Sequence, residues 1–218
     1  MKILALELSS TRGSVALVNG DKVEFDREWP NDRKNSGPFF EYLAEVQNQF
    51  GKPHVIIVGL GPGSYAGTRI AISAAIGLSF GGTGSVPSDE LMGRHGGHPS
   101  IRLIGFLSIC AIECGASDYC VIGDARRQTF SFTRVRDNDS AEGPTLMTEA
   151  ELREKLDKMD RKMSIFATEK LPQFERAEVR YPSAEVLARL ANDSNRKFAQ
   201  PPLEPMYLHE PHITIPKK

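Results

Sequence analysis

The chain has 218 residues, with 27 Lys and Arg against 28 Asp and Glu and a formal net charge of −1. Hydrophobic residues make up 40% and charged residues 25%, which is typical of a globular domain and excludes a disordered, collagen-like or disulfide-stapled chain. The balanced charge also excludes a broad basic field for nucleic acid, though not a local basic patch. We find no apolar run of about 18 residues and expect no membrane span.

The first third of the chain predicts an antiparallel three-stranded meander, then a helix, a strand and a second helix. Asn19-Gly20-Asp21 is a hairpin signal between two strands, and Gly51-Lys52-Pro53 ends the first helix. Residues 54–59 are almost wholly apolar and β-branched, as expected of a strand buried on both faces. The predicted strands are 3–8, 14–18, 22–27 and 54–59, and the predicted helices are 38–50 and 65–80.

The remainder predicts a second α/β half after a Gly-rich segment at 81–100. Thr148 and Glu151 form a capping box at the start of one helix, and Ser183 caps the last one. The two halves, 1–80 and about 100–200, each place strands before helices. The elements predicted here are strands at 102–106, 119–124, 128–135 and 164–167, a short helix at 109–112, and a turn at 137–140.

A glycine-rich turn connects the strand at 54–59 to the helix at 65–80. Gly61 and Gly63 permit close backbone approach, and Ser64 could cap the helix and also reach a ligand. A turn of this kind before a helix N-terminus can bind phosphate. Neither the Walker pattern nor the dinucleotide spacing is present, so a tight structural turn remains the alternative.

The helix at 65–80 is unusually rich in small residues. Gly67, Ala71, Ala74 and Gly77 would let another helix approach closely, while an exposed glycine in a helix costs about 1 kcal/mol. Two explanations remain open: tight packing inside the domain, and a helix–helix interface with another subunit.

Five segments, in this order, resemble the TsaB (YeaZ) family, the bacterial subunit of tRNA threonylcarbamoyladenosine biosynthesis once grouped with glycoproteases. The resemblance covers nearly the whole chain except about 81–100. It is carried by Lys2-Ile3-Leu4-Ala5-Leu6-Glu7-Leu8-Ser9-Ser10, Ser14-Val15-Ala16-Leu17, Gly61-Pro62-Gly63-Ser64-Tyr65-Ala66-Gly67-Thr68-Arg69, Gly123-Asp124-Ala125-Arg126-Arg127 and Glu204-Pro205-Met206-Tyr207-Leu208.

The resemblance implies an α/β, two-lobed actin/Hsp70-like ATPase (ribonuclease H-like) fold. We expect a first lobe at 1–100, including the Gly-rich connection, and a second lobe with an extended tail at 101–218. It also implies a cytoplasmic, non-catalytic subunit that pairs with a TsaD-like catalytic subunit, or forms a homodimer when alone. With a TsaE-like ATPase, such a complex transfers a threonylcarbamoyl group onto adenosine 37 of tRNA.

The family pairs through helices of the first lobe, here the helices 38–50 and 65–80. No catalytic residue, metal site or intrinsic cofactor is predicted, and ATP and a metal are implied for the TsaD-like partner. Glu7 stands where the family commonly has Asp, a residue that organises metal and phosphate in catalytic relatives. The partner-interface candidates are Phe39, Tyr42, Gly67, Ala71, Ala74, Ala75 and Leu78, and the candidates for a polar site between the lobes are Glu7, Asp124 and Arg126.

Two enzymatic alternatives have weaker support. A small-molecule kinase or ATPase of the same fold would use Gly61, Gly63, Ser64 and Asp124 around phosphate. A glycoprotease-like metallopeptidase would need a His-x-x-x-His pair, which the chain lacks. The pairs His95/His98 and His209/His212 supply only two ligands each, whereas a stable zinc site takes three or four.

Overall fold

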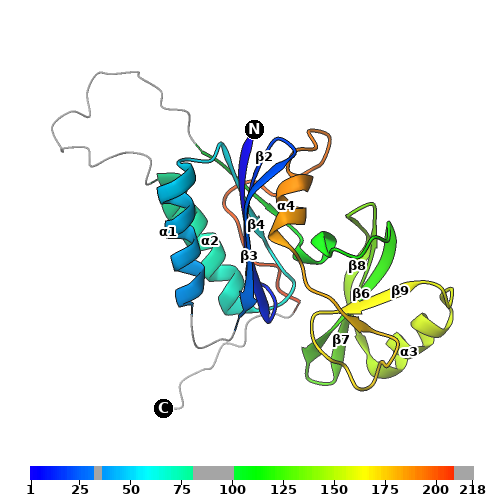
Figure 1. Ribbon diagram of the computed structural model, residues 1–218. Coiled ribbons are helices and arrows are strands. Elements are labelled where there is room, and N and C mark those ends of the chain that lie inside the picture. Colours follow the sequence, from blue (N-terminus) through cyan, green and yellow to red (C-terminus); the bar gives the residue numbers. More distant parts are fainter. Residues whose placement is uncertain (32–35, 81–100, 209–218) are drawn as a thin grey trace, which may run out of the picture. The chain divides into compact units, whose positions relative to one another are not determined.

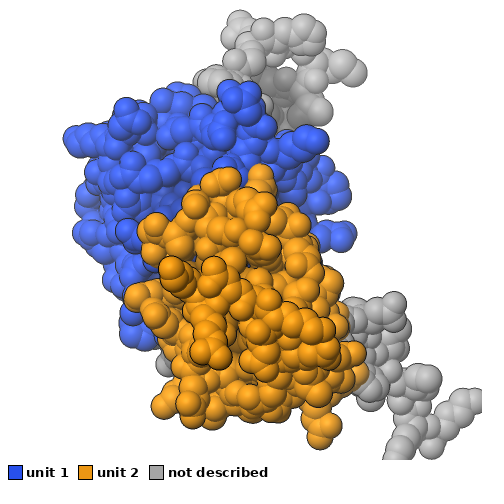
Figure 2. Space-filling model, turned by 90° about the vertical axis from the view of Figure 1, so that its right-hand side faces the viewer, with its two compact units in different colours: residues 1–113, 181–205 blue, residues 114–180, 206–218 orange. Residues whose placement is uncertain are grey.

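The computed structural model describes residues 1–31, 36–80 and 101–208. The chain forms two compact units, coloured separately in Figure 2: unit 1 comprises residues 1–113 and 181–205, and unit 2 comprises 114–180 with the tail from 206. This division differs from the predicted boundary between residues 100 and 101, because the segment 101–113 and a returning segment near the end both belong to unit 1. The Gly-rich residues 81–100 lie outside the described residues.

Unit 1 is built on a five-stranded mixed sheet of order β3-β2-β1-β4-β5. The first three strands form the predicted antiparallel meander, and β4 and β5 continue the sheet parallel to β1. The central strands β1 and β4 are almost wholly buried, in keeping with their apolar sequences. The strands are β1 (Lys2–Glu7), β2 (Arg12–Asn19), β3 (Lys22–Pro30), β4 (Val55–Gly59) and β5 (Arg102–Phe106).

Helices cover both faces of this sheet. Helices α1 (Gly37–Phe50) and α2 (Tyr65–Phe80) lie side by side on one face, and α4 (Ala184–Leu190) covers the other (Figure 1). Trp29, Phe39 and Leu43 are among the large side chains buried beneath the two-helix layer. A short 3-10 helix, η1 (Ser108–Ala111), follows β5 at the carboxyl edge of the parallel strands.

Unit 2 contains a second five-stranded mixed sheet, of order β10-β9-β6-β7-β8. Strands β6, β7 and β8 form an antiparallel meander, and β9 and β10 continue the sheet in parallel from β6. This arrangement repeats the strand order and directions of unit 1. The elements are β6 (Asp118–Arg126), β7 (Thr129–Arg136), β8 (Asp139–Thr148), α3 (Glu149–Asp157), β9 (Ser164–Ala167) and β10 (Glu178–Val179).

Most predicted elements are confirmed within two or three residues, and so is the capping box of Thr148 and Glu151 that starts α3. Two strands were missed. Strand β8 is a mostly exposed edge strand that contains Gly143-Pro144, so its sequence lacks the apolar alternation that marks a strand. Strand β10 is only two residues long.

Candidate functional site

Glu7 ends strand β1 at the carboxyl edge of the parallel strands, where open α/β sheets commonly bind ligands. Its side chain is fully buried, and its Oε1 accepts a hydrogen bond of 2.6 Å from the Ser9 backbone N–H. The other carboxyl oxygen lies over Gly59 of β4, where an added Cβ would overlap it. Gly59 therefore leaves the space that the Glu7 carboxyl fills.

Burial raises the pKa of Glu7, and hydrogen bonds from Ser108 and Ser9 offset this only in part. Ser108 lies on η1, and its Oγ also accepts a hydrogen bond of 2.9 Å from the Gly61 N–H. The buried carboxyl thus joins the end of β1 to the turns that follow β4 and β5.

The glycine-rich turn packs directly on the backbone that follows β1. An added Cβ at Gly63 would overlap the Ser9 carbonyl oxygen, and one at Gly67 would overlap that of Leu8. The Ser64 N–H donates to the Ser9 carbonyl at 2.5 Å, and the Gly67 N–H donates to Ser64 Oγ at 3.3 Å. Gly61 also adopts a φ of 89°, which L side chains rarely adopt.

The contacts favour the structural explanation for this turn. Gly61, Gly63 and Ser64 come together as predicted, but the N–H groups of Gly61, Ser64 and Gly67 donate to groups of the protein. A phosphate would have to compete with these bonds. Phosphate binding here stays a prediction.

Three of the small residues of α2 are buried inside unit 1. Gly67, Ala71 and Ala75 are buried at four-residue spacing, which places them on one helix face. That face packs on the sheet of unit 1, so these three residues serve the packing of α2 inside its own unit and do not offer a surface to another subunit. Phe39 of α1 is likewise only 1% exposed.

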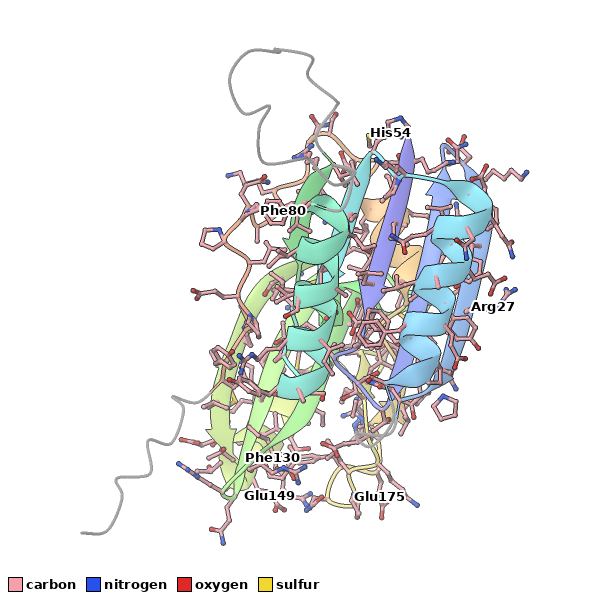
Figure 3. All side chains as sticks on the ribbon, turned by 90° about the vertical axis from the view of Figure 1, so that its left-hand side faces the viewer. Arg27, His54, Phe80, Phe130, Glu149 and Glu175 are labelled. Carbon is pink, nitrogen blue, oxygen red and sulfur yellow. The ribbon has the colours of Figure 1, made fainter. Side chains whose placement is uncertain are left out.

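The remaining predicted interface residues, Tyr42, Ala74 and Leu78, are partly buried against the same core. The apolar side chains that α1 and α2 expose are different ones. They are Phe40 (50% exposed), Tyr65 (50%), Ile76 (38%) and Phe80 (73%), and Figure 3 looks onto this side, with Phe80 labelled at the end of α2. A large apolar residue outside the buried stripe was the signal that could have found them.

Asp124 and Arg126 meet at the hairpin between β6 and β7. Asp124 Oδ1 accepts from the Arg126 N–H at 2.7 Å, and Asp124 Oδ2 lies 3.2 Å from Arg126 Nη1. Both residues belong to unit 2, whereas Glu7 belongs to unit 1. The predicted polar site between the lobes, which joins all three, therefore stays a prediction.

No group of three or more His, Cys, Asp and Glu suited to a metal ion occurs among residues 1–31, 36–80 and 101–208. His95, His98, His209 and His212 lie outside that part of the chain. No helix in the described segments has the length and hydropathy needed to cross a membrane.

Comparisons with known proteins give a structural likeness. No protein-family model and no curated protein sequence matches the chain. A crystal structure from Pseudomonas aeruginosa, described as an uncharacterized protein with similarity to peptidase YeaZ, matches with a TM-score of 0.68 and 18% identity over 95% of this chain and 99% of that one. YeaZ from Pseudomonas aeruginosa matches with a TM-score of 0.60 and 18% identity, over 88% of this chain and 90% of that one. The chain has the fold of these structures, which confirms the predicted two-lobed α/β fold.

Proposed function

We propose that this chain is a TsaB (YeaZ)-type subunit, a non-catalytic scaffold that activates a TsaD-like threonylcarbamoyl transferase. With a TsaE-like ATPase, the complex would make N6-threonylcarbamoyladenosine at position 37 of tRNA in the cytoplasm. The observation that carries this proposal is the likeness to the structure described as similar to YeaZ, which extends over 95% of this chain and 99% of that one. The five sequence segments described above agree with it.

Protein groups occupy the space at the carboxyl ends of β1 and β4, which supports a subunit that does not itself bind or transfer phosphate. The Glu7 carboxyl fills the space over Gly59, and the Ser64 N–H donates to the Ser9 carbonyl. A kinase or ATPase of this fold would need that space and those donors for phosphate. Nucleotide and metal are accordingly assigned to the TsaD-like partner.

The exposed apolar residues of α1 and α2 are the proposed pairing surface. Phe40, Tyr65, Ile76 and Phe80 come from two adjacent helices on one face of the unit 1 sheet. Exposed aromatic and aliphatic side chains are typical of protein interfaces. The same surface would form the homodimer when the partner is absent.

Sedimentation of the chain with the TsaD-like subunit of the same genome, with Mg²⁺ and ATP present, tests the proposal. We expect a larger species with wild type and at least tenfold weaker pairing with Ile76→Glu, because a buried unpaired carboxylate is costly at an interface. Val179→Glu is the matched control, since Val179 is 37% exposed on unit 2. ATP turnover by the chain alone, with no pairing, would instead establish the kinase or ATPase alternative.

A further inference from the structure

The two hairpin turns of unit 2 have similar backbones but very different residues. Between β7 and β8, Asp137 and Asn138 have φ values of 51° and 58°. Two-residue turns with positive φ at both positions favour Asn, Asp and Gly. Between β6 and β7, Arg127 and Gln128 have φ values of 52° and 61°, and Arg126 before them has 70°.

Three consecutive residues without this preference thus occupy the left-handed region. That region is unfavourable for side chains such as those of Arg and Gln, and local strain of this kind concentrates at functional sites. The turn needs neither guanidinium to form, because the Asp137-Asn138 turn has the same signs of φ without one. Some other role for the arginine side chains would explain why they are present.

Of the two arginines at this tip, Arg126 is paired with a carboxylate and, within the part of the chain that the structure describes, Arg127 is not. Asp124 holds Arg126 through both its backbone N–H and its guanidinium. Arg127 is exposed, and among the described residues no hydrogen bond or ion pair is found for its side chain. Four other arginines of unit 2 have carboxylate partners, namely Arg134 and Arg136 with Asp118, Arg153 with Glu149 and Arg180 with Glu178. Within the described segments Arg161 and Arg176, like Arg127, have none, but neither of them lies at a hairpin tip with positive φ.

We propose that the hairpin tip, Arg126 to Gln128, binds an acidic segment of a partner protein, with Arg127 as the main contact. The planar guanidinium pairs well with carboxylates, as Arg134 does with Asp118 at 2.7 Å in the same unit. A nucleic acid fits less well. Its affinity comes from many phosphate contacts, whereas the chain has a net charge of −1 and this tip carries two arginines.

The first test is a nuclear magnetic resonance titration of the labelled full chain with hexaglutamate and, separately, with tRNA. We expect hexaglutamate to shift the amide signals of 126–128 in wild type. The double variant Arg127→Asn/Gln128→Gly should lose these shifts, whereas Lys170→Glu, at an exposed position of unit 2, should keep them. Equal shifts in the double variant, or localised shifts with tRNA but not with hexaglutamate, would overturn the proposal.

The second test measures the strain. The double variant installs the turn residues that positive φ favours, so its Tm should rise by about 2–4 °C while binding is lost. An unchanged or lower Tm would show that the native turn carries no strain, and would overturn the reasoning. Both tests use this chain alone, so their failure leaves the proposed pairing through α1 and α2 intact, and failed pairing does not affect them.

Discussion

Unit 1 and unit 2 share one strand order, but the connection between the first two strands of the meander is buried in unit 1 and exposed in unit 2. In unit 1 the connection between β1 and β2 lies under the glycine-rich turn, and Ser9 and Ser10 within it are buried. In unit 2 the connection between β6 and β7 is an exposed hairpin tip with three positive φ values. The same strand topology therefore does not determine whether a connection is buried or exposed to solvent.

The difference traces to the segment that follows the next parallel strand. In unit 1, β4 leads into the glycine turn and the 16-residue helix α2, which packs back on the end of β1. In unit 2, β9 leads to β10 through residues 168–177, which contain no helix. Small residues at 59, 63 and 67 are what allow the covering in unit 1, because each lies where a Cβ would overlap the chain beneath it.

The largest expected effect comes from Gly67→Ala, which disrupts the packing of α2 on the β1–β2 connection. The new methyl group would overlap the Leu8 carbonyl oxygen, and because that atom belongs to the backbone, α2 or the β1–β2 connection must move. We expect a loss of about 3 kcal/mol in the free energy of unfolding, at the upper end for overpacking, as measured by urea denaturation.

Gly77→Ala on the same helix is the matched control. Gly77 is exposed, and nothing lies within 4 Å of its added Cβ. This substitution should stabilise the protein by about 0.5–1 kcal/mol, because alanine favours the helix over glycine. If both variants destabilised the protein equally, the close approach of Gly67 to Leu8 would not explain the packing of α2 on the β1–β2 connection.

The buried Glu7 gives a second, pH-dependent way to test the covered connection. Burial raises its pKa above the ordinary 4.5, so the folded state keeps a proton that the unfolded state releases. The stability of the wild type should therefore fall as the pH rises above about 4.5 toward the folded-state pKa, by up to about 1.4 kcal/mol per pH unit.

Glu7→Gln removes this titration while keeping the shape of the side chain. As the pH is raised from about 5 to about 8, the free energy of unfolding of this variant should rise relative to that of the wild type. Urea denaturation at each pH measures the difference. Glu178→Gln, at an exposed carboxylate of β10, should show no such gain. A constant difference between Glu7→Gln and wild type across the range would contradict a proton held on Glu7.

The contrast between the units also shows what the sequence could predict. Apolar β-branched runs identified β1 and β4, and helical spacing identified α1 and α2, because burial imposes those periods. The glycine turn was recognisable, but its packing on Ser9 and Leu8 depends on chain segments more than 50 residues apart. The interface prediction took small residues as the signal, and in α2 Gly67, Ala71 and Ala75 lie inside because they allow close approach to the sheet.

The smallest expected effect lies at the open end of the β6–β7 hairpin, away from its tip. Hydrogen bonds from Arg134 and Arg136 lower the pKa of Asp118 to about 2 from the ordinary 3.8. The pairs should therefore add stability above pH 3.8 and lose it as the pH falls toward 2. Since Asp118 is 29% exposed, the contribution should stay within about 1 kcal/mol and weaken with salt.

Asp118→Asn tests this by urea denaturation at low salt between about pH 2 and pH 5. The variant should be less stable than wild type at the upper end of the range, and the difference should vanish at the lower end. A difference that persists at the lowest pH would mean that packing, not charge, holds this end of the hairpin.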